Sequence, residues 1–443
     1  LDLDGSFDFE LAPEVGGGAG RRRNTDVSRR SARFGLTAPL AGGDLQATAA
    51  FEALRRGLPG KSFAPSDSAR QRLHRLRASS VWSGALGGAA ADATAYATWQ
   101  RVETADPTPP FGLPFDERAT LVQVGLRTSA RGGLGPAAQW TASFDVDRLA
   151  YEATSLAAGA PDGRTDVGGS IGLMLRPGPG GAELGATVRA QWDGLAGRLR
   201  WTHELAARVR TGPVGWRVAH RSAYAPPTFG DQFFREGVAV RSNPDLAAER
   251  VPSEVEVGFD VPLSGAWGSL RLQGSAFTGD VRGMIVWLPD FRFVWSPRNT
   301  DVRRRGAELA VEAGLPRWGV EASAAYTYAR LVYDRAGPAV QVAYRPRHSG
   351  RVEVRVARAG FRVRLASRYT GARFPVPNAV NALPGFVATD LSVERAVRIG
   401  RAEVRVSALV DRLFDRREAL VFAYPDPGRT LRFALRVRRA STP

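Results

Sequence analysis

Residues 361–369 read Phe-Arg-Val-Arg-Leu-Ala-Ser-Arg-Tyr, and residues 429–438 read Arg-Thr-Leu-Arg-Phe-Ala-Leu-Arg-Val-Arg. In both segments apolar and cationic side chains alternate with a period of two, which gives a β-strand one apolar and one charged face. The same pattern recurs along the chain, with almost no helical periodicity that could cover either face. It is typical of a transmembrane antiparallel up-and-down β-barrel, and we predict this all-β fold.

The composition narrows the class of protein. The chain has 443 residues and a net charge of +17, which on its own would suggest binding to nucleic acid. Lys61 is the only lysine, and the arginines recur singly along strand patterns instead of gathering in one patch. Coding bias is an alternative reason for the number of arginines. It does not explain why they occupy alternate positions of the strand patterns. We therefore expect no nucleic-acid partner.

The connections between predicted strands alternate between short and long. Short connections such as 398–400, 357–360 and 315–317 carry Gly or Pro, as tight turns require. Long connections such as 224–250 and 279–299 lie between them, and 193–197 is an exception, short where a long loop is due. Short turns on one side and long loops on the other match an outer-membrane barrel. Counting predicts about twenty strands of ten to sixteen residues each.

The two faces can be assigned from the cost of charge in lipid. An arginine at mid-depth facing lipid costs ~2–4 kcal/mol, so the charged face points into the lumen and the apolar face points to lipid. Phe361, Val363, Leu365 and Tyr369 are therefore predicted to face lipid. The predicted lumen-facing arginines, which we expect to hold carboxylates of a plug domain, are Arg271, Arg362, Arg364, Arg368, Arg432 and Arg436.

Cysteine and histidine offer no evident metal site. The chain has no Cys, which excludes disulfides and thiolate sites. Its four histidines, His74, His203, His220 and His348, show no pair at a spacing typical of metal ligands, and we expect ordinary lumen or loop residues. No metal site and no cofactor are predicted.

One long segment, residues 222–259, is the most specific in the chain. It contains Ala-Pro-Pro-Thr-Phe at 225–229, Asn-Pro-Asp-Leu at 243–246, and then Glu249, Ser253, Glu254, Glu256 and Gly258. Three further stretches follow in order: 299–312 with Gly306 and Glu308, 344–348 with Arg-Pro-Arg-His, and 412–435 with Phe414, Pro427 and Gly428. Together they resemble the strand and turn motifs of TonB-dependent outer-membrane receptors. The residues carrying this resemblance that we single out are Pro226, Asn243, Pro244, Leu246, Glu249, Gly306, Glu308, Phe414, Pro427 and Gly428.

The resemblance implies a 22-stranded barrel filled by an N-terminal plug, which engages an energising inner-membrane protein of the TonB type. Residues 1–11 look like the third strand of such a barrel. We therefore expect residues 1–443 to form a single barrel domain of about twenty strands, without the plug and the first hairpin. The chain would be a fragment of a longer product or a contracted barrel. The motif residues are expected to define the fold more than to contact ligand, because Asn-Pro-Asp-Leu is turn chemistry.

Candidate ligand contacts are the aromatic side chains of the long loops, because aromatic rings offer area at a low entropic cost. They could equally pack against each other. The predicted ligand-binding residues are Phe111, Phe115, Phe229, Phe233, Phe234, Trp287, Phe291 and Trp295.

A catalytic alternative rests on Gly168-Gly169-Ser170-Ile171-Gly172, which matches the pattern G-x-S-x-G. That motif needs a turn from strand to helix, whereas this copy lies within a strand pattern. We therefore expect a transporter and not an enzyme.

The expected function is energy-coupled uptake of a scarce nutrient across the bacterial outer membrane. The ligand would be a metal chelate such as a ferric siderophore or haem, or a cobalamin. The expected partners are this ligand, the plug, the TonB-type protein, and the lipid bilayer with its lipopolysaccharide. The alternative is a passive, plug-free diffusion channel, and a barrel hydrolase is a third possibility.

Overall fold

The structure is a computed structural model that describes residues 2–12, 23–110, 113–178, 181–233, 241–290, 294–334, 340–376, 381–400, 402–416, 418–426 and 428–439. The chain divides into two compact units. Unit 1 comprises Leu1–Ala207, His220–Ser253 and Arg282–Thr300, and unit 2 comprises Arg208–Ala219, Glu254–Val281 and Asp301–Pro443.

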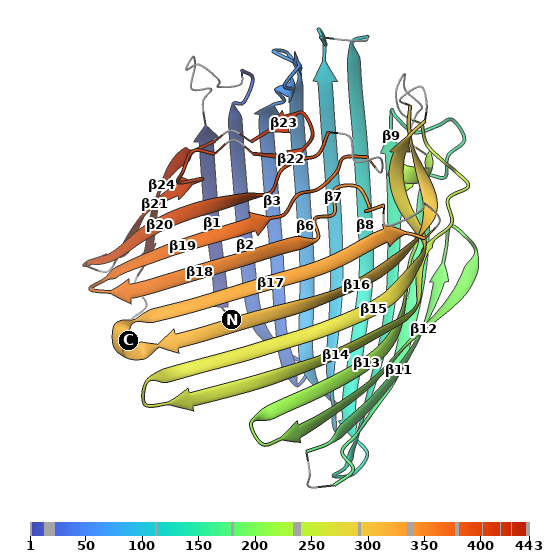
Figure 1. Cartoon of the computed structure of the whole chain (residues 1–443), viewed down its shortest axis with the longest axis vertical. Helices are drawn as coiled ribbons and strands as arrows, with labels where there is room; N and C mark the ends of the chain where they lie inside the picture. Colours follow the sequence, from blue (N-terminus) through green and yellow to red (C-terminus); the bar gives the residue numbers. More distant parts are fainter. Residues whose placement is uncertain are drawn as a thin grey trace. The chain divides into compact units, whose positions relative to one another are not determined.

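Strands account for almost all of the regular structure (Figure 1). The first part of the chain forms β1 (Asp2–Ala12), β2 (Val27–Leu40), β3 (Gly43–Gly57), β4 (Gly60–Lys61), β5 (Ala64–Pro65), β6 (Arg70–Leu86), β7 (Ala89–Asp106), β8 (Phe115–Gly133), β9 (Ala138–Ala153), β10 (Gly163–Leu175) and β11 (Glu183–Asp193). Strands with residues in both units are β12 (Arg198–Thr211), β13 (Val214–Ala225), β14 (Glu249–Gly265), β15 (Gly268–Pro289) and β16 (Trp295–Leu315). The last part forms β17 (Val320–Tyr333), β18 (His348–Arg358), β19 (Phe361–Thr370), β20 (Phe386–Ile399), β21 (Ala402–Asp411), β22 (Ala419–Val421), β23 (Tyr424–Pro425) and β24 (Thr430–Arg439). The helical elements are α1 (Phe229–Phe233) and the 3-10 turn η1 (Pro316–Trp318).

Within each unit, long strands that follow one another in the sequence pair antiparallel. In unit 1 this holds from β1 to β11, with the small hairpin β4–β5 set aside. In unit 2 it holds from β17 to β24, with β22–β23 set aside. Among the described residues, twenty strands take part in one hydrogen-bonded sheet. The predicted all-β, up-and-down fold with about twenty strands is confirmed.

Strand lengths differ from the prediction on the long-loop side. β15 has 22 residues and β16 has 21, where ten to sixteen were expected. The segment 279–299, predicted as a loop, is therefore mostly strand. Its sequence contains several β-branched and aromatic residues, among them Val286, Trp287 and Trp295, and such residues favour extended structure.

The short turns have the geometry that the sequence predicts. Ala359 and Gly360, which join β18 to β19, have φ of 51° and 77°. Two consecutive residues with positive φ are characteristic of the type I′ turn, whose twist matches that of paired strands. Gly suits the second position because it has no Cβ.

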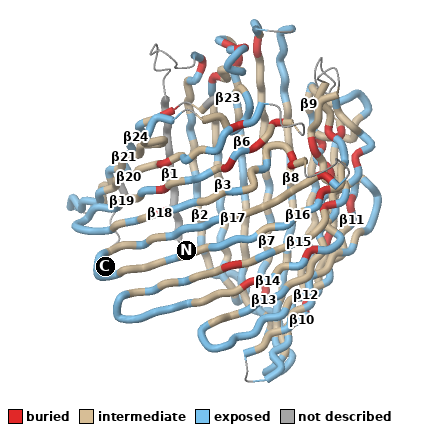
Figure 2. Tube along the Cα trace, viewed as in Figure 1, coloured by how far each residue is buried: buried red, intermediate tan, exposed pale blue. Residues whose placement is uncertain are grey.

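Figure 2 shows that most strand residues are intermediate or exposed and that few are buried. Phe361, Leu365 and Tyr369 on β19 keep about two fifths of their surface exposed, at 40%, 41% and 40%. In contrast, Glu254, Asp193, Val302 and Pro297 are the largest fully buried side chains, so two of the four carry charge. The apolar side chains therefore point away from the charged face of the sheet and do not form the core of a water-soluble protein.

None of the helices in the described part of the chain has the length and apolar character that a membrane-crossing helix needs.

Candidate functional site

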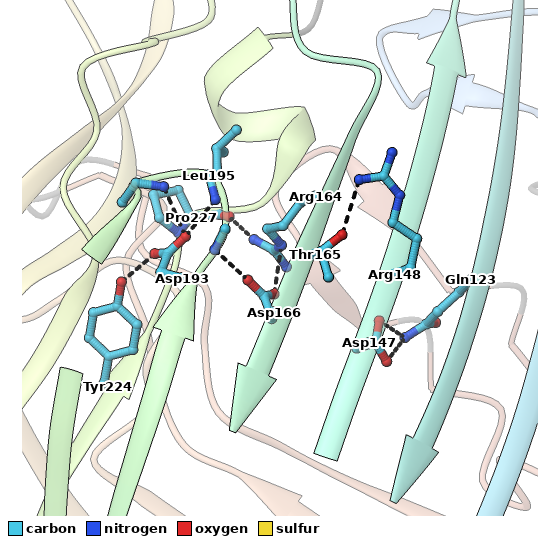
Figure 3. Close-up of polar contacts among 12 residues, drawn as sticks. Gln123, Asp147, Arg148, Arg164, Thr165, Asp166, Asp193, Leu195, Tyr224 and Pro227 are labelled. Atoms are coloured by element: carbon cyan, nitrogen blue, oxygen red, sulfur yellow. Dashed lines mark hydrogen bonds and ion pairs between the residues drawn. The ribbon is translucent and has the colours of Figure 1, made fainter. Parts of the chain in front are cut away.

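The long-loop ends of β10, β11 and β13 in unit 1 carry a polar cluster (Figure 3). Asp193, which is 2% exposed, accepts hydrogen bonds from the amides of Leu195 and Ala196 at 3.1 and 3.0 Å. The Tyr224 hydroxyl donates to the other carboxylate oxygen of Asp193. This carboxylate closes the tight connection 193–197, which explains why a short turn occurs on the long-loop side.

Arg164 joins this cluster to the first family-like motif (Figure 3). Its guanidinium donates to the carbonyl oxygen of Pro227 at 3.2 Å and forms an ion pair with Asp166 at 2.9 Å. It also lies 6.0 Å from the ring centre of Phe229. Asp166 in turn accepts from the amide of Gly194 at 3.1 Å. The segment after β13 is thereby fastened to β10.

Helix α1 begins two residues after Pro227, and side-chain hydrogen bonds hold it in place. The Thr228 hydroxyl caps it by accepting from the amide of Asp231 at 3.2 Å. Asp231 accepts from the indole nitrogen of Trp287 at 2.9 Å. The side-chain amide of Gln232 donates to the carbonyl oxygen of Pro244 at 3.2 Å. α1 therefore links the two halves of the motif segment.

The side chains of Asn243 and Glu249 form hydrogen bonds with backbone groups. Asn243 donates to the carbonyl of Pro297 at 3.1 Å and accepts from the amide of Asp245 at 3.1 Å. Glu249 accepts from the amide of Ile285 at 2.6 Å. These contacts join the turn residues to the backbone of neighbouring segments.

The other motif residues divide between buried and exposed positions. Leu246 is 6% exposed, whereas Phe414 is 68% exposed. Gly428 is buried with φ of 82°, and Gly306 lies in β16 opposite Ala329. Glu308 is also in β16 and Pro226 directly follows β13, while Pro427 lies outside the described residues.

The aromatic residues predicted to bind ligand fall into three groups. Phe229 is 6% exposed and packs against Tyr151 and Phe233, with ring centres 6.1 and 6.0 Å away. Trp287 and Trp295 are half-buried in strands, and Phe115, the first residue of β8, is 47% exposed. Phe111, Phe234 and Phe291 lie outside the described residues. Among the described members of the predicted set, Phe115 is the most open to a ligand.

The predicted lumen arginines are largely paired with carboxylates of the chain itself. Arg271 pairs with Asp260 at 2.6 Å, Arg362 with Glu394 at 3.3 Å, Arg364 with Glu353 at 2.8 Å, and Arg432 with Asp411 at 2.7 Å. Within the part of the chain that the structure describes, Arg368 and Arg436 make no such ion pair. The cross-strand register, which alternation alone does not give, supplies these carboxylates.

Unit 2 also has a charged cavity of about 650 Å³ near the short-turn ends of β14 to β18. Arg271, Glu312, Glu321, Glu353 and Arg355 contribute its charged side chains. Its wall carries two arginines and three glutamates, so it offers pairing positions to a polar surface of either sign.

Arg373, between β19 and β20, was not predicted from the sequence. It is 2% exposed and donates to the carbonyl oxygens of Ala419 and Leu420, which fastens the β22–β23 hairpin. Burial lowers the pKa of the Arg373 guanidinium. Its position beside Phe386, 5.4 Å from the ring centre, emerges only on folding.

Ser170 lies within β10, as predicted, and its hydroxyl is 2.6 Å from that of Ser143 on β9. The segment is a strand in which Gly169 pairs with Phe144, so the strand-to-helix turn of a nucleophile is not formed here.

Residues 2–408 match the family described as "TonB dependent receptor-like, beta-barrel". Because this match spans most of the chain, the protein belongs to that family, a family of outer-membrane receptor barrels. A search of curated protein sequences gave no match.

Several solved structures with a similar fold are distant from this chain in sequence. "Copper transporter OprC" has a TM-score of 0.74 at 15% identity, covering 97% of this chain and 74% of that one. "The FrpB iron transporter from Neisseria meningitidis (F3-3 variant)" has a TM-score of 0.70 at 14% identity, with 98% and 77% covered. The ferric-catecholate import receptor Fiu from K12 E. coli has a TM-score of 0.69 at 13% identity, with 97% and 76% covered. At these identities the likeness establishes the fold.

Proposed function

We propose that this chain is the barrel domain, residues 1–443, of a receptor that takes up a scarce nutrient across the bacterial outer membrane with energy from a TonB-type protein. The nutrient is a metal chelate such as a ferric siderophore or haem, or a cobalamin. Family membership supports the receptor class. Similar solved structures are transporters or receptors named for copper, iron, ferric catecholate or haem, which supports a metal-containing ligand.

The observation that carries this proposal is the rigid construction of the long-loop end of unit 1. Asp193, Arg164 and Asn243 each bind backbone groups of a different connection. Connections held in this way lose little conformational entropy when a ligand binds. Contacts made there therefore contribute more fully to affinity. Phe115 is the first residue of β8, at a long-loop end, and its side chain is exposed.

Paired inner-wall charges suggest how a plug would be held. A plug carboxylate that approaches Arg364 must compete with Glu353, 2.8 Å away. Arg368 and Arg436 offer guanidinium groups without this competition, and charge-assisted hydrogen bonds to them are the stronger kind. We therefore assign plug contact first to these two arginines among the six.

Ligand binding by the purified protein tests the proposal. The full-length gene product in detergent would be titrated with a ferric catecholate, haem and cyanocobalamin, and tryptophan fluorescence followed. Saturable quenching by one of the three is expected. If none binds saturably while circular dichroism shows an intact β-fold, the assigned ligand class is wrong.

A passive diffusion channel is the competing function, and it predicts a different electrical behaviour. A receptor conducts little in a planar bilayer until its plug is displaced with denaturant. Steady conductance of the full-length product without such treatment would favour the passive channel and contradict energy-coupled uptake.

A further inference from the structure

Two of the four histidines meet across the sheet. His203 on β12 and His220 on β13, separated by 17 positions in the sequence, have their Nε2 and Nδ1 atoms 3.1 Å apart. Their ring centres are 5.0 Å apart, with the planes inclined by 29°. The sequence spacing of the histidines gives no sign of this contact, which arises because strands β12 and β13 lie side by side.

Both remaining ring nitrogens have a serine hydroxyl in reach. His203 Nδ1 is 3.1 Å from Ser222 Oγ, and His220 Nε2 is 2.9 Å from Ser253 Oγ. Hydrogen bonds therefore connect the four side chains in one row across β12, β13 and β14. Each imidazole is thus oriented by a partner on the side opposite to the other imidazole.

The pair lies on the apolar face of the strands. His203 shares its face of β12 with Trp201 and Leu205, which are 66% and 53% exposed, because side chains two apart point the same way. His220 shares its face of β13 with Trp216 and Val218, which are 44% and 47% exposed. In a transmembrane barrel this face meets lipid. Ionisable side chains are costly there and generally mark a function.

The spacing of the two nitrogens suits a shared metal ion. Nitrogens bound at 2.0–2.1 Å to one ion, with an angle of 90–110° between them, lie about 2.8–3.4 Å apart, and the pair has 3.1 Å. Imidazole is a preferred ligand of Zn²⁺, Cu²⁺ and Ni²⁺. Metal-bound histidines usually donate their other N–H to an oxygen, which fixes the ring. Ser222 and Ser253 supply such oxygens.

We propose that His203 and His220 bind one transition-metal dication on the membrane-facing surface, with Ser222 and Ser253 positioning the two rings. The ion would replace the proton shared between Nε2 of His203 and Nδ1 of His220. Among the described residues, no group of three or more His, Asp or Glu side chains could hold a metal, so this is a two-histidine chelate with open positions. It does not depend on the proposed uptake function.

Copper binding tests this assignment. The full chain, with any histidine tag removed, would be titrated with CuCl2 in detergent and followed by electron paramagnetic resonance, and with ZnCl2 by calorimetry. One equivalent of Cu²⁺ with two nitrogen ligands is expected. His203→Asn and His220→Asn should each weaken binding at least tenfold. The double variant should lose little more than either single one, because a chelate needs both rings.

Matched controls separate the pair from other histidines. His348→Asn removes an imidazole that contacts Tyr326 instead of another histidine, and should leave metal affinity unchanged. Ser222→Ala and Ser253→Ala should each weaken binding about tenfold, the lower range for a group that orients a ligand. Zn²⁺ should raise the unfolding temperature of the natural sequence but not of His203→Asn.

Affinity that survives both single histidine variants, or a copper signal with oxygen ligands alone, would overturn the proposal. The metal-free unfolding temperature of each variant shows whether it folds. If both histidine variants fail to fold, two measurements still test the proposal. They are the metal affinity of Ser253→Ala and the number of nitrogen ligands in the copper spectrum of the natural sequence.

Discussion

The side chain of Asn299 pairs with Ala247 as a strand backbone would. Its Oδ1 accepts from the Ala247 amide at 2.8 Å, and its Nδ2 donates to the Ala247 carbonyl at 2.8 Å. The same Nδ2 donates to the carbonyl of Gly283 at 2.7 Å. One amide thereby joins the segment before β14, strand β15 and strand β16 across 52 positions of sequence.

Replacement of Asn299 by Ala should destabilise the protein by about 1–3 kcal/mol, since backbone groups lose their partners. Asn299→Asp keeps the acceptor and loses both donated hydrogen bonds, so an effect of similar size is expected. Thermal unfolding in detergent measures both. An Asp variant as stable as the natural sequence would show that the donated bonds contribute nothing.

Glu353 on β18 neutralises three arginines. It lies 2.8 Å from Arg364 and 2.6 Å from Arg355, also pairs with Arg351, and is 4% exposed. Glu353→Gln should cost about 1–3 kcal/mol, because three guanidinium groups then repel each other. High salt should restore part of the loss.

Glu321→Gln is the control for this prediction. Glu321 pairs with Arg355 at 3.8 Å while its side chain is 73% exposed, so the change should be within about 0.5 kcal/mol. Equal effects of the two variants would contradict the assigned role of burial.

Gly306, a residue of the second motif, has no room for a side chain. A Cβ would lie 2.3 Å from the Tyr328 carbonyl oxygen and 2.6 Å from the Phe277 ring. Gly306→Ala should therefore destabilise by about 1–3 kcal/mol. Gly350→Ala, where the nearest atom would be 3.3 Å away, should be much milder in the same denaturation assay. The reverse order would refute the steric explanation.

Phe115 and Phe229 should respond differently to truncation. Phe115→Ala should weaken binding of the nutrient about tenfold, with little loss of stability, because its ring is 47% exposed. Phe229→Ala should instead cost about 3–5 kcal/mol of stability, because its ring is buried. Fluorescence titration and thermal unfolding of both variants separate the two roles. Unchanged affinity in Phe115→Ala would remove Phe115 from the binding surface.

Strand character and the orientation of faces could be predicted because both follow from local alternation. Arg362 and Arg364 point to the same side in any regular strand, and lipid decides which side that is. The turn at Ala359 and Gly360 could also be predicted, because it depends on adjacent residues. The extent of β15 and β16 could not be predicted, because the hydrogen bonds that prolong a strand come from a partner strand.

Pairing across strands depends on register, which one strand cannot specify. The partner of Arg364 is Glu353, 11 positions earlier, and the partner of Arg362 is Glu394, 32 positions later. His203 and His220 also meet only because β12 and β13 align there. The sequence by itself determined a two-faced, up-and-down β-structure with arginine on its polar side, because side-chain direction alternates within each strand. Only the tertiary structure decided which carboxylate neutralises each arginine and which histidines touch, because those contacts are set by the hydrogen-bond register between strands.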